Sequence, residues 1–337
     1  MYKHLLNKLT QMVLIVFIVS SITFFVVRLF PGDPVHLWVG GHPTEEQIER
    51  ATKELGLNKP MYIQYISFLK NLVLFDLGVS IRTKQPVILE LANRFSATFE
   101  LVFFSMILAF IIGFPLGLLA ALKSNTLLDT FIRGIGYIGL AIPIFWLGMM
   151  MQLIFFGTLQ WFPLQGRYAG ISSLDAQLIY TTGFLLFDSL LSGEWGLFFD
   201  GLWHIILPAS TMAFGVLGII LRTTRSAMVD SMNEPFFQTY ISYGFNNVET
   251  IRCSAYKNTL IPVSTIAGLT FGLMLGGTFL VESIFDWPGL GQFSVLSILT
   301  NDFPAIIGVT ILYTITYVIV NFSIDIFYGF VDPRIKK

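Results

Sequence analysis

Six long apolar runs, separated by polar segments, decide what this chain can fold into. A helix needs about 20 mostly apolar residues to cross a bilayer, and each run is close to this length or longer. Hydrophobic residues make up 54% of the 337 residues and charged residues only 12%, whereas a soluble domain carries roughly 25% charged residues. The sequence therefore predicts an all-α membrane protein with six spanning helices, at Met12–Phe30, Phe99–Leu122, Gly134–Leu159, Ile205–Leu221, Val263–Val281 and Pro304–Tyr328.

A seventh apolar run, Leu178–Leu191, is shorter and is interrupted by Gly183 and Asp188. It has the length of an interfacial or re-entrant segment, and counting it as a span would reverse the orientation of everything after it. The first run lacks a small-residue cleavage pattern and is followed by further spans, so we expect a retained anchor.

The distribution of Lys and Arg favours six spans with both termini in the cytoplasm. Cytoplasmic loops of membrane proteins are enriched in these residues, and only very long external loops escape the rule, as the first one does here. The two later external loops then contain Arg167 alone. The cytoplasmic side receives Lys3, Lys8, Lys123, Arg133, Arg222, Arg225, Arg252, Lys257, Arg334, Lys336 and Lys337. We therefore predict a multi-pass protein of the cell membrane.

This topology divides the chain into four parts. They are an N-terminal anchor helix (1–30), an extracytoplasmic subdomain (31–93), a transmembrane core (94–328) and a cytoplasmic tail (329–337). The core carries an external insert at 160–203 and a cytoplasmic loop at 222–262. In the subdomain, Thr44 followed by two acidic residues predicts the start of a helix. The insert is expected to be acidic on its outer face because Asp175, Asp188, Glu194 and Asp200 outnumber Arg167.

Motifs of enzyme chemistry are missing from the sequence. There is no Gly-x-x-x-x-Gly-Lys-Ser/Thr loop for nucleotide phosphates, no Gly-x-Ser-x-Gly elbow and no His-Glu-x-x-His pair. The single cysteine, Cys253, excludes an internal disulfide and a cysteine metal cluster. The histidines, which are His4, His36, His42 and His204, lack the spacing of metal ligands. We expect no catalytic residue, no metal and no cofactor on this chain.

Ionisable residues within the spans offer little support for ion coupling. Glu100 and Glu282 lie at the outer ends of the second and fifth spans, where we expect water to reach them, and Asp325 lies near the inner surface. Charges at midplane would indicate a proton relay. We therefore interpret these as helix-end charges, with an ion-coupled secondary transporter acting as a single polypeptide as the alternative.

Glycines recur every fourth residue in two spans. They are Gly113 and Gly117, with Pro115 between them, and Gly268, Gly272 and Gly276. Each set lies on one helix face and lets another helix approach closely, either within the chain or at a subunit interface or moving gate. Pro143 and Pro208 predict kinks in the third and fourth spans.

A polar stretch from Arg222 to Asn258 separates the fourth and fifth spans. Phe236, Tyr240 and Tyr243 follow helical spacing and predict an aromatic stripe. Such a helix suits a groove on a separate subunit, although the bilayer surface is an alternative. We assign to this docking surface Glu234, Phe236, Tyr240, Tyr243, Gly244, Val248, Ile251 and Pro262.

Several motifs in order along the chain carry a family resemblance. Gly244 and the later run Asn258-Thr259-Leu260-Ile261-Pro262 resemble the cytoplasmic signature of binding-protein-dependent ABC transporter permeases. Five further motifs resemble the peptide/nickel branch of this family. They are Pro31-Gly32-Asp33-Pro34, Phe75-Asp76-Leu77-Gly78-Val79-Ser80, Leu221-Arg222-Thr223-Thr224-Arg225-Ser226, Trp287-Pro288-Gly289-Leu290-Gly291 and Asp332-Pro333-Arg334. Within this branch the chain is most similar to the dipeptide permease subunit that pairs with a second permease.

The resemblance implies a type I ABC importer fold and a set of partners. This subunit would form, with a second non-identical permease, a path for di- or oligopeptides or a related substrate such as a nickel complex or glutathione. Two ATPase subunits would hold the ATP and Mg, and an extracytoplasmic binding protein would deliver the substrate. Gly244 would allow a tight turn in the coupling loop, and Pro262 would lie in the first turn of the fifth span.

One departure from the family concerns charge. Members carry a run similar to Arg-Thr-Ala-Arg-Ala-Lys-Gly before the glycine, whereas residues 238–244 read Gln-Thr-Tyr-Ile-Ser-Tyr-Gly. Three basic positions have become Gln238, Ile241 and Tyr243. The resemblance therefore implies that contact with the ATPase depends more on apolar burial here.

Overall fold

The computed structural model of the protein describes residues 2–29, 34–40, 43–54, 56–169, 182–251 and 255–331. Over these ranges the chain is helical, with a single antiparallel bridge between Val79 and Pro86. The long helices are α1 (Tyr2–Leu29), α5 (Val87–Leu122), α10 (Trp195–Asn233), α13 (Tyr256–Ile284) and α15 (Phe303–Val331). The shorter elements are α2 (Pro34–Val39), α3 (Glu45–Glu54), α4 (Met61–Val73), α6 (Leu127–Ala141), α7 (Ile144–Met151), η1 (Gln152–Thr158), α9 (Leu185–Ser192), α11 (Pro235–Ser242), α12 (Asn247–Thr250) and α14 (Leu290–Leu299).

The five long helices are apolar enough to cross a membrane, and α6 with α7 and η1 makes a bent pair that could supply a sixth crossing. Five of the six expected spans are therefore confirmed. The expected boundary at residue 94 falls inside α5, which continues unbroken from Val87. The apolar run at 178–191 is described only in part, and its described helix α9 has 8 residues, too few to span.

The third expected span is wrong as a single helix. The chain turns by 101° between α6 and α7, and Ile142 at the break is extended, with φ −79° and ψ 126°. Pro143 explains the break, because it lacks an N–H and disfavours the helical conformation of the residue before it. Pro208, by contrast, lies within α10 and does not interrupt it.

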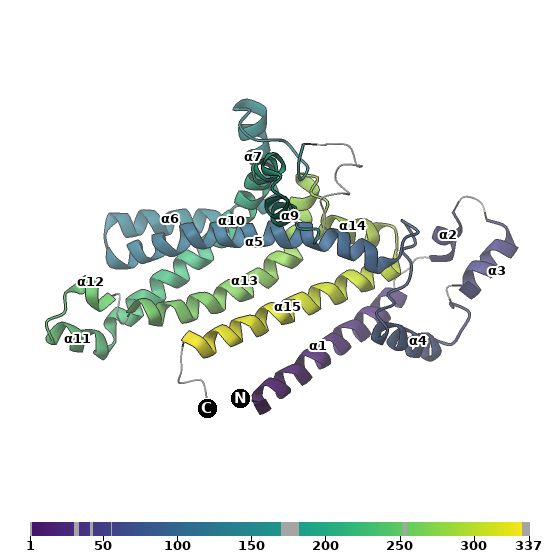
Figure 1. Cartoon of the computed structure of the whole chain (residues 1–337), viewed down its shortest axis with the longest axis horizontal. Helices are drawn as coiled ribbons and strands as arrows, with labels where there is room; N and C mark the ends of the chain where they lie inside the picture. Colours follow the sequence, from purple (N-terminus) through teal and green to yellow (C-terminus); the bar gives the residue numbers. More distant parts are fainter. Residues whose placement is uncertain are drawn as a thin grey trace.

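The helix α10 lies at the centre of the core and packs along α5, α6 and α13 (Figure 1). Glycines allow the closest approaches. A Cβ atom on Gly117 would meet the carbonyl oxygen of Leu221 at 2.7 Å, and one on Gly113 would meet that of Leu217 at 3.2 Å. The pair Gly113 and Gly117 therefore packs within the chain, against α10.

The two ends of the bundle differ. In Figure 1 the N-terminal end of α1, the C-terminal end of α15 and the α11–α12 segment lie toward one end, and α2, α3, α4 and α14 lie toward the other. Thr44 begins α3 as expected, since the Gln47 N–H donates to its Oγ1 and its own N–H donates to Gln47 Oε1 at 2.9 Å. This reciprocal arrangement is a capping box.

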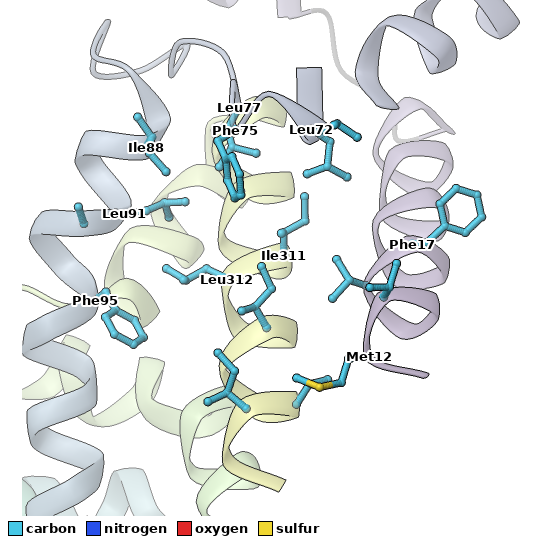
Figure 2. A pocket seen from close by; sticks show the side chains of 18 of the residues that line it. Met12, Phe17, Leu72, Phe75, Leu77, Ile88, Leu91, Phe95, Ile311 and Leu312 are labelled. Atoms are coloured by element: carbon cyan, nitrogen blue, oxygen red, sulfur yellow. The ribbon is translucent and has the colours of Figure 1, made fainter. Parts of the chain in front are cut away.

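A groove of about 900 Å³ lies between α1, α4, α5 and α15. Figure 2 shows that the side chains around it are apolar, among them Phe17, Phe75, Phe95 and Leu312. A peptide carries charged ends and backbone amides that need partners when they leave water. The groove offers such a molecule no hydrogen-bonding side chain, so we do not place a peptide pathway there.

Candidate functional site

The polar connection between α10 and α13 folds into two short helices. Glu234 is extended, with φ −70° and ψ 147°, and Pro235 then begins α11, a position where its missing N–H is harmless. The helix ends at Ser242 with Tyr243 as its C-cap, and Gly244 adopts φ +86°. This confirms the expected glycine turn, since a positive φ is strained for residues with a side chain. The helix α12 follows, capped by reciprocal bonds between Asn246 and Glu249 of 2.9 and 3.1 Å.

One face of α11 is anchored to the bundle. Phe237 is 7% exposed and packs with Ala121 of α5, Met228 of α10 and Ala255. Phe236 and Ile251 are partly buried against the same cluster. Phe237 was not predicted from the sequence, because the helical spacing of the aromatic stripe starts at its neighbour Phe236. Its place as a second aromatic residue at the start of the same helix is the signal that could have found it.

Apolar side chains are exposed at the C-terminal end of α11 and just beyond it. Tyr243 is 79% exposed, and Ile241 and Phe245 are also exposed. Tyr240 supports this surface, since its ring meets the Phe245 ring edge-on with 5.4 Å between centroids. The expected stripe is thus divided, with Phe236 facing inward and Tyr243 outward. We define the docking face as Tyr240, Ile241, Tyr243 and Phe245; the side chain of Val248 lies outside the described part of the chain.

The expectation for Pro262 is wrong. The helix α13 begins at Tyr256, so Pro262 lies inside it, past its first turn. Proline in this position leaves the carbonyl group of Asn258 without its helical N–H donor. The expected loop also begins too early, because α10 continues as a helix from Arg222 to Asn233.

An ion pair that was not predicted from the sequence holds the N-terminal end of α6 to α10. Arg225 donates from Nε to Asp129 Oδ1 at 2.6 Å and from Nη2 to Oδ2 at 2.7 Å. The Asn125 N–H donates to the same carboxylate at 3.0 Å. Arg225 belongs to a family-like motif, but its partner lies 96 residues earlier in the chain, which no local pattern reveals.

At the other end of the bundle, the expectation that water reaches Glu100 and Glu282 is wrong. Glu100 is 5% exposed. Its carboxylate accepts from Arg167 and from the Leu186 N–H, the latter at 2.8 Å. Arg167 also donates to the Gly183 carbonyl group at 3.1 Å. Arg167 therefore pairs within the protein and fastens the insert to α5.

Glu282 is fully buried and organises the motif that begins at Trp287. Its carboxylate accepts from Thr98 Oγ1 at 2.6 Å and from the Gln292 N–H at 2.8 Å. A Cβ atom on Gly289 would collide with that carboxylate, so glycine is required there. Trp287 completes the joint by donating from Nε1 to the Ala97 carbonyl group at 2.9 Å.

The acidic outer face expected for the insert is also corrected. Asp188 is buried and accepts from Thr182 Oγ1 at 2.7 Å and from the Gly183 N–H at 2.9 Å. Asp200 accepts from the Ala169 N–H at 2.7 Å and lies 3.3 Å from His204 Nδ1. Glu194 is exposed, and Asp175 lies outside the described residues. Two of the acids thus serve the insert's own folding.

The three glycines Gly268, Gly272 and Gly276 of α13 differ in what they face. A Cβ atom on Gly268 would collide with Ile324, and one on Gly272 with the Tyr317 ring, so both pack against α15 within the chain. Nothing lies within 4 Å of the Cβ position of Gly276. Of this set, only Gly276 presents an open face.

Comparison with known proteins identifies the class. Residues 113–337 match the model of the binding-protein-dependent transport system inner membrane component family. Residues 1–102 match the N-terminal model of membrane components of the same systems. The chain belongs to this family, with the all-α fold of a type I ABC importer permease, and it is a membrane permease component rather than an enzyme.

Curated relatives extend over nearly the whole chain. A probable D,D-dipeptide transport system permease protein of Escherichia coli K12 is 41% identical over 329 residues, which is 97% of this chain and 95% of the relative. A di/tripeptide transport system permease protein of Pseudomonas aeruginosa is 37% identical over 94% of both chains. A dipeptide transport system permease protein of Alkalihalophilus pseudofirmus is 35% identical over the full length of both.

Proposed function

We propose that this chain is one permease subunit of an ATP-driven importer of di- and oligopeptides. It forms the translocation path together with a second, non-identical permease, receives substrate from an extracytoplasmic binding protein and is driven by two cytoplasmic ATPase subunits that hold ATP and Mg. The names of the relatives support the peptide substrate, and membership of a family of binding-protein-dependent systems disfavours the alternative of an ion-coupled transporter made of one polypeptide.

The observation that carries the coupling role is the two-sided character of α11. Phe237 fixes the helix to α5 and α10, while Tyr243 and Phe245 remain exposed on a segment outside the spanning helices. Exposed aromatic residues on an anchored helix suit a hydrophobic groove on another subunit. We infer that the docking face enters a groove on an ATPase subunit, and that the end of the bundle carrying α11 faces the cytoplasm.

The chemistry of the docking face predicts how the contact responds to mutation and to salt. Fully burying a side chain of phenylalanine size contributes about 1.5–3 kcal/mol. Exposed ion pairs contribute about 0–1 kcal/mol and are screened by salt. Apolar burial should therefore dominate this contact.

The experiment compares co-purification of the ATPase subunits with two variants of the full chain. Tyr240→Ala with Tyr243→Ala should weaken ATPase binding at least about tenfold while the chain remains in the membrane, and wild-type assembly should survive moderate salt. Gln238→Ala, an exposed position on the same helix, is the matched control and should bind normally. Normal assembly and peptide uptake by the double variant would contradict the coupling role of this surface.

A further inference from the structure

The Asp129–Arg225 ion pair joins α6 to α10. Asp129 lies in the first turn of α6 and is fully buried, and Arg225 lies toward the C-terminal end of α10. Arg133 approaches the same carboxylate, with its Nε 3.2 Å from Oδ1. Two parallel N–H···O bonds from one guanidinium fix orientation as well as distance. The pair therefore holds α6 in one register along α10.

The other contacts between these two helices are apolar contacts and close backbone approaches. Ile132 of α6 forms an apolar cluster with Leu217 and Leu221 of α10 and Ala120 of α5. Further along, Gly136 and Gly218 meet without side chains, since a Cβ atom on Gly218 would collide with Gly136. Apolar contact is non-directional. Among the side-chain hydrogen bonds of the described residues, those of Arg225 are the ones that join α6 to α10.

The same part of α10 is tied to the docking helix. Met228 lies one turn beyond Arg225 and packs against Phe237 of α11, and α10 is unbroken between them. A displacement of α11 therefore moves the end of α10 with it. Because of the ion pair, the inner end of α6 follows.

The opposite end of α6 is a bend. After Ala141 the chain turns by 101° at Ile142 and Pro143. Beyond α7, Gln152 donates from Nε2 to the carbonyl groups of Ile284 and Leu164, both at 2.9 Å. These groups belong to the outer end of α13 and to the insert. The helix α6 thus runs from the α10 contact to a bend that leads to the outer side.

We propose that the Asp129–Arg225 pair is the positioning contact through which movement of the docking helix is passed to α6, and through the bend at Pro143 to the outer end of the permease. The inference rests on the proposed function, because it requires an importer whose ATPases displace α11. In this role both residues act by keeping α6 in step with α10, and neither needs to touch the ATPase or the substrate.

The test uses the complete complex of this chain with its second permease and ATPases, reconstituted in proteoliposomes with the binding protein. Asp129→Asn keeps the side-chain size and an acceptor for the Asn125 N–H, and Arg225, which is 21% exposed, can reach water. We expect the ATPases to remain bound and ATP hydrolysis to continue, while the number of peptides imported per ATP falls at least fivefold. Arg225→Lys, which retains the charge but loses the two-pronged geometry, should also lower this ratio.

Arg222→Gln is the matched control, because it removes an exposed cation from the same helix one turn away, and it should keep the wild-type ratio. Spin labels at Tyr137 on α6 and Ser242 on α11 give a second readout. Their separation should stay constant on ATP binding in the otherwise unmodified chain and change in Asp129→Asn.

A wild-type import ratio in Asp129→Asn and in Arg225→Lys, with unchanged label separation, would overturn the inference and leave the proposed function intact. Failure of the wild-type complex to import any peptide on ATP hydrolysis would overturn both.

Discussion

Single residues show why burial, and not position along a helix, decides what a charge does in this protein. The sequence places Glu100 and Arg167 at or beyond the end of a span, where water is expected, yet both side chains are buried and paired. The sequence predicts that each belongs to the outer side but cannot predict the pair, because 67 residues separate them. Asp129 and Arg225 also form a pair that the sequence cannot predict, because 96 residues separate them. Long-range partners of this kind require the tertiary structure.

The Glu100 pair allows a direct test of burial. Glu100→Gln leaves Arg167 charged and buried without a counter-charge, which should cost about 3–5 kcal/mol. The amide keeps an acceptor for the Leu186 N–H, so the loss reports on the charge alone. Combining it with Arg167→Met should recover most of that loss, since replacing both members of a buried pair is often nearly neutral. The midpoint of thermal unfolding in detergent measures both effects, and equal midpoints for the single variant and the wild type would contradict this account.

At the scale of elements, hydrophobic periodicity predicted the long helices well and their interruptions poorly. Five spans match because a run of apolar residues in a bilayer must satisfy its backbone internally as a helix. The sequence predicts a kink at both Pro143 and Pro208, but Pro143 breaks its span whereas Pro208 lies within the unbroken helix α10. The difference depends on packing against neighbouring helices, which no local sequence pattern contains.

The attachment of α11 is the element-scale prediction. Phe237→Ala removes the aromatic ring that packs among Ala121, Met228 and Ala255, and truncation of a buried phenylalanine costs about 3–5 kcal/mol. The helix should then separate from the bundle while the spans remain folded. Hydrogen exchange of residues 235–251 should rise strongly in the variant, with α5 and α10 unaffected within the membrane. Unchanged exchange would show that other contacts hold α11.

For the whole molecule, the N-terminal end of α1, the C-terminal end of α15 and the α11–α12 segment lie toward the same end of the bundle (Figure 1). This arrangement agrees with the distribution of cations along the sequence, which favours that end in the cytoplasm. The family-like glycine and proline positions were recognisable from sequence. The structure, however, gives them different tasks, since Gly244 makes a turn and Pro262 lies within α13.

The orientation is checked by cysteine labelling in intact spheroplasts, in a chain with Cys253→Ser. Ser242→Cys on α11 should react with an impermeant maleimide only after the membrane is opened, because the docking segment is predicted to face the cytoplasm. Glu194→Cys in the insert should react in intact spheroplasts. The reverse pattern would invert the six-crossing topology.

Peptide uptake by reconstituted complexes tests the central claim most directly. Proteoliposomes would contain this chain with its second permease and ATPase subunits, with the binding protein and a labelled dipeptide outside and ATP inside. The account predicts uptake that requires ATP hydrolysis, the binding protein and the ATPases, and that is unaffected by collapsing ion gradients. Uptake by the isolated chain, driven by an ion gradient without ATP, would contradict it.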